Sequence, residues 1–163
     1  QNPTTPPTAT RTPTATLPAS GNTHSGAWAA KVILTAAASY KDLYQENITV
    51  SPNTSMAASL WIKGTGAVKL NIWNASWGTN IASKKCTASA AWTQCTLTFN
   101  TGSRTKLVLD LESAYGTAGT VYVDDLFLGV SGGSNLLTNP GFESGAAGWN
   151  SSDPAVWQIT SNP

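Results

Sequence analysis

The sequence predicts an all-β domain, a sandwich of two antiparallel sheets, and three observations support this prediction. Short apolar alternations separated by Gly, Asn, Ser and Pro recur from Ser25 onward, as is typical of strands and tight turns. The main polar residues are Thr, Ser and Asn, and only 10% of residues are charged, so helix-forming faces are scarce. The length of 163 residues suits one domain.

Residues 1–19 differ from the rest because Pro and Thr alternate there with almost nothing to bury. This composition predicts an extended linker, and residues 20–163 are expected to form the folded domain. The best defined of roughly eight expected strands are Trp28–Thr35, Asn47–Ser51, Met56–Lys63, Val68–Asn74, Thr93–Asn100, Lys106–Leu111 and Val121–Leu128. The segment Ala36–Tyr44 is the single helix candidate.

Period-two alternation assigns the side chains of each strand to two faces. The strands on either side of Gly64-Thr65-Gly66 each have one apolar row and one mixed row, and the turn between them predicts a hairpin. Trp61 on the first strand and Trp73 on the second are therefore expected on one outward surface. Val108 and Asp110 are predicted to face outward from the strand Lys106–Leu111.

This outward surface is the candidate ligand site, because it combines aromatic rings with polar side chains. The C–H faces of sugars pack on aromatic rings, and their hydroxyl groups need partners that donate and accept hydrogen bonds. Seven tryptophans also exceed what one core readily absorbs, although Trp28, Trp92, Trp149 and Trp157 are expected in the core or at the sandwich ends. The candidate sugar-binding residues are Trp61, Trp73, Trp77, Lys69, Asn71, Gln94, Asp110 and the loop residue Tyr115.

Cys86 and Cys95 lie in two stretches that are predicted to be neighbouring strands, so a cross-strand disulfide is geometrically feasible. The alternative is a pair of buried free thiols in a reducing compartment. Their spacing matches no zinc site, and the single histidine, His24, is far away in the sequence.

Charge and motifs argue against several classes of function. A formal net charge of +1 supplies no basic patch for nucleic acid or an anionic membrane surface, so an uncharged partner is expected. No apolar run approaches the roughly 20 residues that span a bilayer. Asp110 and Glu112 share one strand face, so they would not flank a glycosidic bond, and the sequence contains no nucleophile paired with a base. We expect no enzyme activity.

The C-terminal stretch Asn135-Leu-Leu-Thr-Asn-Pro-Gly-Phe-Glu-Ser-Gly-Ala-Ala-Gly-Trp149 resembles the opening strand of carbohydrate-binding modules of families 4, 9, 16 and 22. Other parts of such a module lie earlier in the chain, namely Ser25-Gly-Ala-Trp-Ala-Ala-Lys31, the Trp61 strand, Trp92-Thr-Gln and the closing Val121-Tyr-Val-Asp-Asp-Leu-Phe-Leu128. The resemblance implies a jelly-roll β-sandwich whose order is circularly permuted, with the opening strand supplied by the C-terminal segment.

Residues 135–163 are therefore either this permuted opening strand or the start of a second tandem module, after a main body of residues 20–134. The segment cannot build a core alone, and a sandwich without its first strand has an open edge, so we expect the segment to dock. Docking within one chain would give a monomer, which we favour, and docking into a neighbour would give a strand-swapped oligomer.

The resemblance also implies a structural calcium ion. In such modules the ion is held by the Glu of the opening motif, an Asp of the closing motif and nearby backbone carbonyls. The matching residues are Glu143, Asp124 or Asp125, and the carbonyls of Gly141 and Lys31. Oxygen ligands from several segments suit a hard cation with flexible coordination. The alternative is that the two Asp residues only form a surface ion pair with Lys31.

The function implied by the resemblance is non-catalytic binding of a polysaccharide, a β-linked glucan, mannan or xylan, by a secreted, extracellular module. The module would hold an appended glycoside hydrolase near its substrate and so raise the local concentration of the enzyme at the polysaccharide. The rival hypothesis is a structural or adhesive extracellular repeat that does not bind sugar. It predicts that Trp73 and Trp77 are buried.

Overall fold

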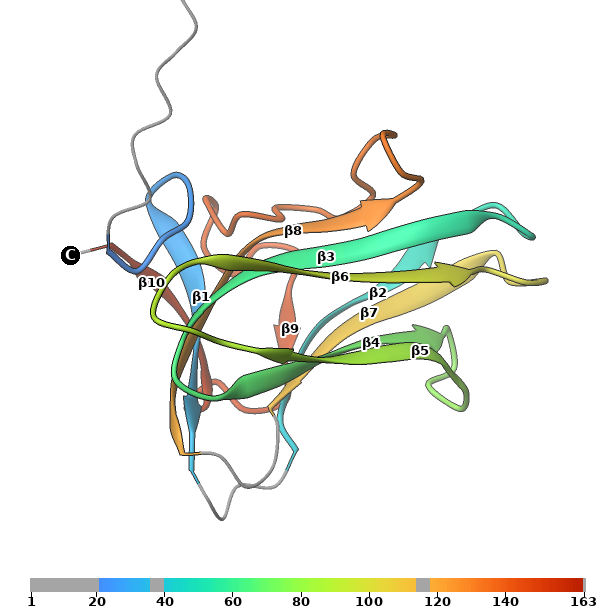
Figure 1. The fold of residues 1–163 in the computed structure, drawn as a ribbon. Coiled ribbons are helices and arrows are strands. Elements are labelled where there is room, and N and C mark those ends of the chain that lie inside the picture. Colours follow the sequence, from blue (N-terminus) through green and yellow to red (C-terminus); the bar gives the residue numbers. More distant parts are fainter. Residues whose placement is uncertain (1–20, 36–39, 114–117, 163) are drawn as a thin grey trace, which may run out of the picture.

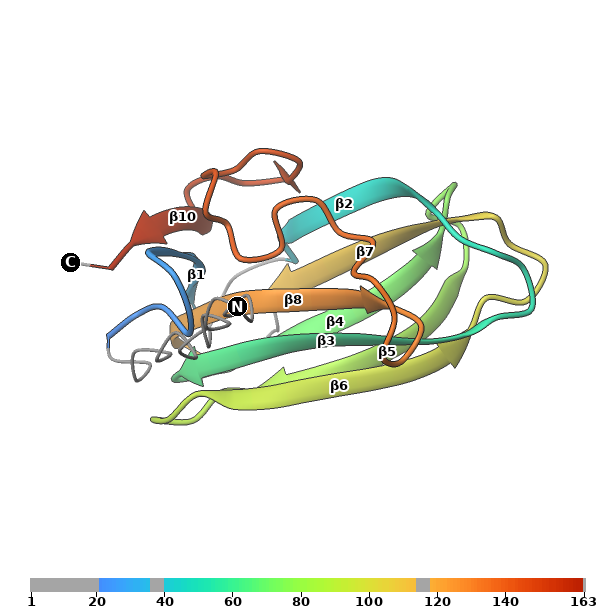
Figure 2. The ribbon, with the colours of Figure 1, turned by 90° about the horizontal axis from the view of Figure 1, so that it is seen from above.

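The computed structural model describes residues 21–35, 40–113 and 118–162, which form two packed five-stranded antiparallel sheets (Figures 1 and 2). Sheet A contains, in spatial order, β10 (Trp157–Ser161), β1 (Trp28–Leu34), β8 (Gly119–Gly129), β3 (Ser55–Gly64) and β6 (Thr93–Asn100). Sheet B contains β5 (Asn80–Thr87), β4 (Ala67–Asn74), β7 (Lys106–Ser113), β2 (Asp42–Thr49) and β9 (Asn150–Ser151). The predicted sandwich of two antiparallel sheets is confirmed.

The core lies between the sheets and is built from the apolar rows that alternation predicts. In β7, for example, Leu107, Leu109 and Leu111 are fully buried and belong to the core cluster, whereas Val108 and Asp110 do not. Because successive strand side chains point to opposite faces, Val108 and Asp110 lie on the outer face of sheet B. The face assignment made for this strand therefore holds.

The predicted hairpin around Gly64–Gly66 is wrong, because this turn carries the chain from one sheet to the other. β3 pairs with β6 and β8 in sheet A, and β4 pairs with β5 and β7 in sheet B. Gly64 and Gly66 both have positive φ, at 124° and 121°, which lets the chain reverse between the layers. Alternation along each strand was interpreted correctly, but local sequence does not specify which sheet receives the next strand.

The C-terminal segment docks within its own chain. β10 pairs with β1 along five residues, and β9 pairs with β2. Phe142, Trp149 and Trp157 are 0%, 7% and 3% exposed and belong to the core cluster, so the segment closes the sandwich. The prediction that the stretch Asn135–Trp149 is itself a strand is wrong, because it forms turns, and β9 and β10 follow it. In Figure 1 this red and orange part of the chain lies beside the blue β1.

The helix candidate Ala36–Tyr44 is wrong over its described part, because Asp42–Tyr44 begins strand β2. Residues 36–39, the predicted linker 1–19 and Tyr115 lie outside the described residues. The described part of the chain contains no helix that is long and apolar enough to cross a membrane.

The predicted disulfide between Cys86 and Cys95 is present. It joins β5, an edge strand of sheet B, to β6, an edge strand of sheet A. The predicted cross-strand geometry is wrong, because the two strands are consecutive in sequence but lie in different sheets and do not pair with each other. The bond therefore links the two sheets along one side of the sandwich.

Candidate functional site

Three aromatic side chains gather on the outer face of sheet B. Trp73 is near the end of β4, Trp77 follows in the β4–β5 loop, and Tyr44 comes from β2 on the far side of β7. The ring centroids of Trp73 and Trp77 are 6.3 Å apart, and those of Tyr44 and Trp77 are 4.9 Å apart in an edge-to-face arrangement. All three side chains are half-buried, so each offers an exposed part of its ring to solvent. We call these three rings the aromatic platform.

A buried polar floor lies beside the platform. Asn71 on β4 and Asp110 on β7 are cross-strand partners on the outer face, yet they are only 0% and 1% exposed. The Asn71 Nδ2 group donates to Asp110 Oδ2 at 3.0 Å, and the Trp73 indole Nε1 donates to the same oxygen at 3.2 Å. Asp110 therefore fixes the orientation of the Trp73 ring.

Two further carboxylates continue this floor. Asp42 on β2 and Glu112 on β7 are cross-strand partners, and Glu112 is also opposite Lys69 on β4, whose Nζ lies 4.0 Å from Glu112 Oε1. Burial raises the pKa of Asp110 to about 7 and also raises the pKa values of Asp42 and Glu112. Three acids thus share a poorly solvated surface, with the Lys69 ammonium beside Glu112 and the Lys41 ammonium acting on Asp42.

Trp61 and Gln94, which were predicted in the same site, lie on the other side of the sandwich. They are cross-strand partners on β3 and β6 of sheet A. The Trp61 ring stacks on His24 with centroids 4.0 Å apart and planes 13° apart, and Trp92 packs against the edge of the same imidazole. The structure therefore separates Trp61 and Gln94 from Trp73, Trp77, Lys69, Asn71 and Asp110, which it does bring together.

Tyr44 and Asp42 are members of the candidate site that the sequence did not predict. Both lie in the predicted helix Ala36–Tyr44, whereas the structure places them in strand β2. The alternation of Asp42 and Tyr44 around the buried Leu43 is the signal that would have placed both side chains on an outer sheet face.

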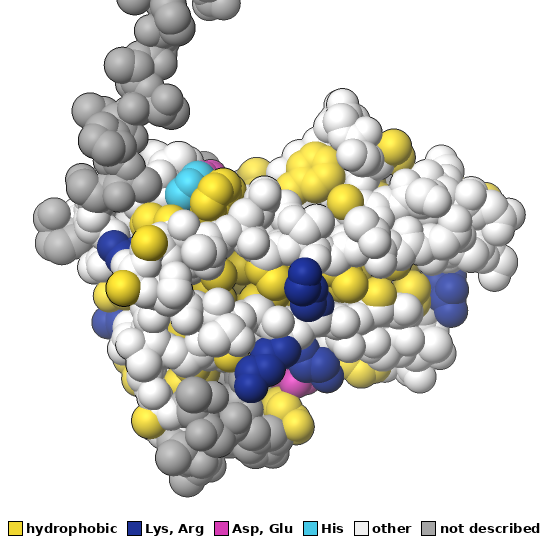
Figure 3. All heavy atoms as spheres, in the orientation of Figure 1, with side chains coloured by type: hydrophobic (Ala, Val, Ile, Leu, Met, Phe, Trp, Pro, Cys, Tyr) yellow, Lys and Arg dark blue, Asp and Glu magenta, His cyan; other side chains and the backbone are white. Residues whose placement is uncertain are grey.

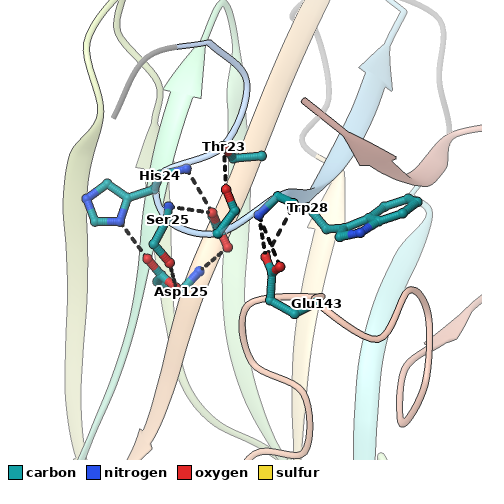
Figure 4. Close-up of polar contacts among 9 residues, drawn as sticks. Thr23, His24, Ser25, Trp28, Asp125 and Glu143 are labelled. Carbon is teal, nitrogen blue, oxygen red and sulfur yellow. Dashed lines mark hydrogen bonds and ion pairs between the residues drawn. The ribbon is translucent and has the colours of Figure 1, made fainter. Parts of the chain in front are cut away.

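The residues predicted to bind calcium meet at a different place, where the C-terminal segment contacts the loop before β1 (Figure 4). Glu143 accepts hydrogen bonds from the backbone N–H groups of Ala27 and Trp28, all at 3.0 Å. Gly26 has a φ of +59° and lies so close to the Glu143 carboxylate that a side chain there would collide with it. We call this contact the junction.

Asp124 and Asp125 on β8 hold the same loop. Asp124 accepts hydrogen bonds from the backbone N–H groups of His24 and Ser25, at 2.8 and 3.1 Å, and from that of Asp125. Asp125 contacts His24 Nδ1 at 2.6 Å and accepts from Ser25 Oγ at 2.7 Å. Burial raises the pKa of Asp124 to about 6.

In this structure these carboxylates are engaged in hydrogen bonds with the chain. Every carboxylate oxygen of Asp124, Asp125 and Glu143 already contacts a hydrogen-bonding group of the chain. Lys31 lies inside β1, which is paired on both sides, so its carbonyl belongs to the sheet ladder rather than to the junction. The calcium ion at the junction stays a prediction, and hydrogen bonds account for the attachment of the segment.

No protein-family model matches the sequence, and no curated protein matches it. Solved structures do match. The apo carbohydrate-binding module of PbXyn10C superposes with a TM-score of 0.59 at 21% identity, over 84% of this chain and 89% of that one. A CBM4 structure, of a family 4 module, has a TM-score of 0.51 at 18% identity, over 62% of this chain and 69% of that one.

A third match is the enzymatically active domain of bacteriophage CBA120 tailspike protein 4, with a TM-score of 0.51 at 13% identity, over 61% of this chain and 15% of that one. At these identities the matches establish the fold, which is the β-sandwich of carbohydrate-binding modules. The resemblance inferred from the sequence is confirmed at that level. Since the same fold also forms a small part of a tailspike domain, the function has to be argued from the site.

Proposed function

We propose that this chain is a non-catalytic module that binds a polysaccharide on the outer face of sheet B. One observation carries the proposal: Trp73 and Trp77 lie 6.3 Å apart, half-exposed, beside the buried polar pair Asn71 and Asp110. Aromatic rings offer the apolar faces on which sugar rings pack, and the buried pair holds the Trp73 ring in place through the bond from Trp73 Nε1 to Asp110 Oδ2. The fold shared with carbohydrate-binding modules supports the same proposal.

The arrangement of the acids supports binding rather than hydrolysis. A glycosidase places two carboxyl groups on either side of the scissile bond, about 5 Å apart or more. Asp42, Asp110 and Glu112 instead lie on one sheet surface, with carboxylate oxygens within 4.8 Å of one another. A sugar chain on this surface would therefore have all three carboxyl groups on one side of it, with Asp110 buried below the other two.

An uncharged glycan fits this surface best. The floor carries three carboxyl groups against the ammonium groups of Lys69 and Lys41, so a uronic acid would find no excess of positive charge there. The face shown in Figure 3 carries Lys and Arg side chains at separate spots rather than in one broad patch. We propose a β-linked glucan, mannan or xylan as the ligand class, bound by a secreted module that tethers an appended glycoside hydrolase.

Affinity electrophoresis tests this proposal directly. The protein is run through native gels that contain a neutral glucan, mannan or xylan, with a polyuronate gel as the comparison. We expect retardation in at least one neutral gel and none in the polyuronate gel. Because a shallow surface immobilises a flexible chain, the dissociation constant should lie in the micromolar to millimolar range. Equal mobility in every gel would contradict sugar binding.

The alternative is a structural or adhesive repeat in which the sandwich acts as a spacer. The half-exposed state of Trp73 and Trp77 disfavours it, because a spacer has no use for aromatic rings at the surface. Acrylamide quenching of tryptophan fluorescence separates the two functions. Sugar binding predicts a quenchable fraction that oligosaccharide protects, and a spacer predicts no such protection. Solution size then distinguishes the expected monomer from a strand-swapped oligomer.

A further inference from the structure

The three acids of the floor have the spacing of ligands around one cation. One oxygen each from Asp42, Asp110 and Glu112 lies within 4.8 Å of the other two. Calcium binds oxygen at about 2.4 Å, so two of its ligands are separated by at most about 4.8 Å. The spacing of the three oxygens is therefore compatible with a single shared ion.

The missing hydrogen bonds of these acids also indicate a cation site. Among the described residues, Asp110 Oδ1 and Glu112 Oε1 are buried and have no hydrogen-bond partner. Oδ1 of the adjacent Asn71, whose side chain is 0% exposed, also has none. Buried acceptors without partners are rare in folded proteins. The junction differs, because each of its carboxylate oxygens is already engaged by the chain.

We propose that Asp42, Asp110 and Glu112 bind a hard divalent cation, of which calcium is the best fit, beside the aromatic platform. The site stands on these residues and does not depend on sugar binding. Calcium takes six to eight oxygen ligands, so three carboxylates leave coordination positions for water or for the hydroxyl groups of a glycan. The Lys69 ammonium, 4.0 Å from Glu112, is at the limit of an ion pair, and the Lys41 ammonium that acts on Asp42 is also paired with Asp153 at 3.5 Å.

Terbium luminescence tests this proposal, because Tb³⁺ occupies calcium sites and emits when a nearby indole transfers energy to it. Trp73, whose Nε1 lies 3.2 Å from Asp110 Oδ2, is placed to sensitise the ion. We expect saturable emission from the wild type that Ca²⁺ displaces. Asp110→Asn and Glu112→Gln should each lower the apparent affinity at least tenfold, whereas Glu143→Gln at the junction should change it less than twofold.

Circular dichroism of each variant checks the fold, and Asp42→Asn serves as the substitute if Asp110→Asn does not fold. Absence of saturable emission in the wild type would overturn the proposal. So would emission from Asp110→Asn and Glu112→Gln that equals that of the wild type, or a loss confined to Glu143→Gln. Affinity gels run with added Ca²⁺ and with chelator measure sugar binding separately. A protein that binds Tb³⁺ but is retarded in neither gel refutes the proposed function alone, and retardation without Tb³⁺ binding refutes the cation site alone.

Discussion

Replacing Phe142 by Ala tests whether the C-terminal segment is an integral part of the sandwich. Phe142 is 0% exposed, and its ring lies 5.1 Å from that of Trp149. Loss of a buried Phe side chain costs about 3–5 kcal/mol, because apolar burial is lost and a cavity is left. Domains of this size have a free energy of unfolding of about 5–15 kcal/mol, so the variant should lose a large share of its stability.

Urea denaturation followed by tryptophan fluorescence measures this change. Leu136→Ala is the matched control, because Leu136 belongs to the same segment but is 42% exposed, and it should cost less than about 1 kcal/mol. Comparing the two variants separates the loss of a buried side chain from any effect that truncation elsewhere in the segment has on the free energy of unfolding. If Phe142→Ala unfolds within about 1 kcal/mol of the wild type, the segment does not complete the core and the reasoning fails.

Three further predictions concern pH, the junction and the disulfide. Burial raises the pKa of Asp110 from 3.8 to about 7. Between about pH 4 and pH 7 the Asp110 carboxyl group is therefore protonated more fully in the folded chain than in the unfolded chain, so the free energy of unfolding should fall as the pH rises through this range. Asp110→Asn should flatten that part of a stability–pH curve, and an unchanged slope would exclude Asp110 as its cause. Glu143→Gln weakens the bonds to Ala27 and Trp28 and should lower the melting temperature measured by circular dichroism, whereas an unchanged value would deny Glu143 a role in the attachment. Replacing Cys86 and Cys95 by Ser opens a loop with a sequence separation of 9 and should cost about 2–3 kcal/mol in urea denaturation, so equal stability would contradict a structural role for the bond.

The strands of this domain could be predicted from the sequence because period-two alternation is a local property. β6 was predicted at its observed bounds, Thr93–Asn100, and β3, β4, β7 and β8 within two residues at each end. β2 was the failure, since its bulge between Gln45 and Ile48 breaks the alternation. β5 was not among the best-defined strands, because its sequence, NIASKKCT, has too few apolar residues to mark a buried face.

The candidate site was only half predictable for a different reason. Alternation places Trp61 and Trp73 outward correctly, but their distance depends on which sheet each strand joins, and strand pairing is decided by contacts between distant segments. The local sequence around Trp61 and Trp73 does not indicate that β3 and β4 belong to different sheets. The contribution of Tyr44 arises in the same way, from the position of β2 beside β7.

The most direct test of sugar binding on sheet B compares two tryptophan variants on opposite faces of the sandwich. Trp73→Ala and Trp61→Ala remove the same side chain, and each residue is half-buried on the outer face of its own sheet. Binding is measured by affinity electrophoresis in the gel that retards the wild type. The account predicts that Trp73→Ala abolishes retardation and that Trp61→Ala preserves it. Retardation that survives Trp73→Ala but is lost in Trp61→Ala would contradict the account and place the ligand on sheet A.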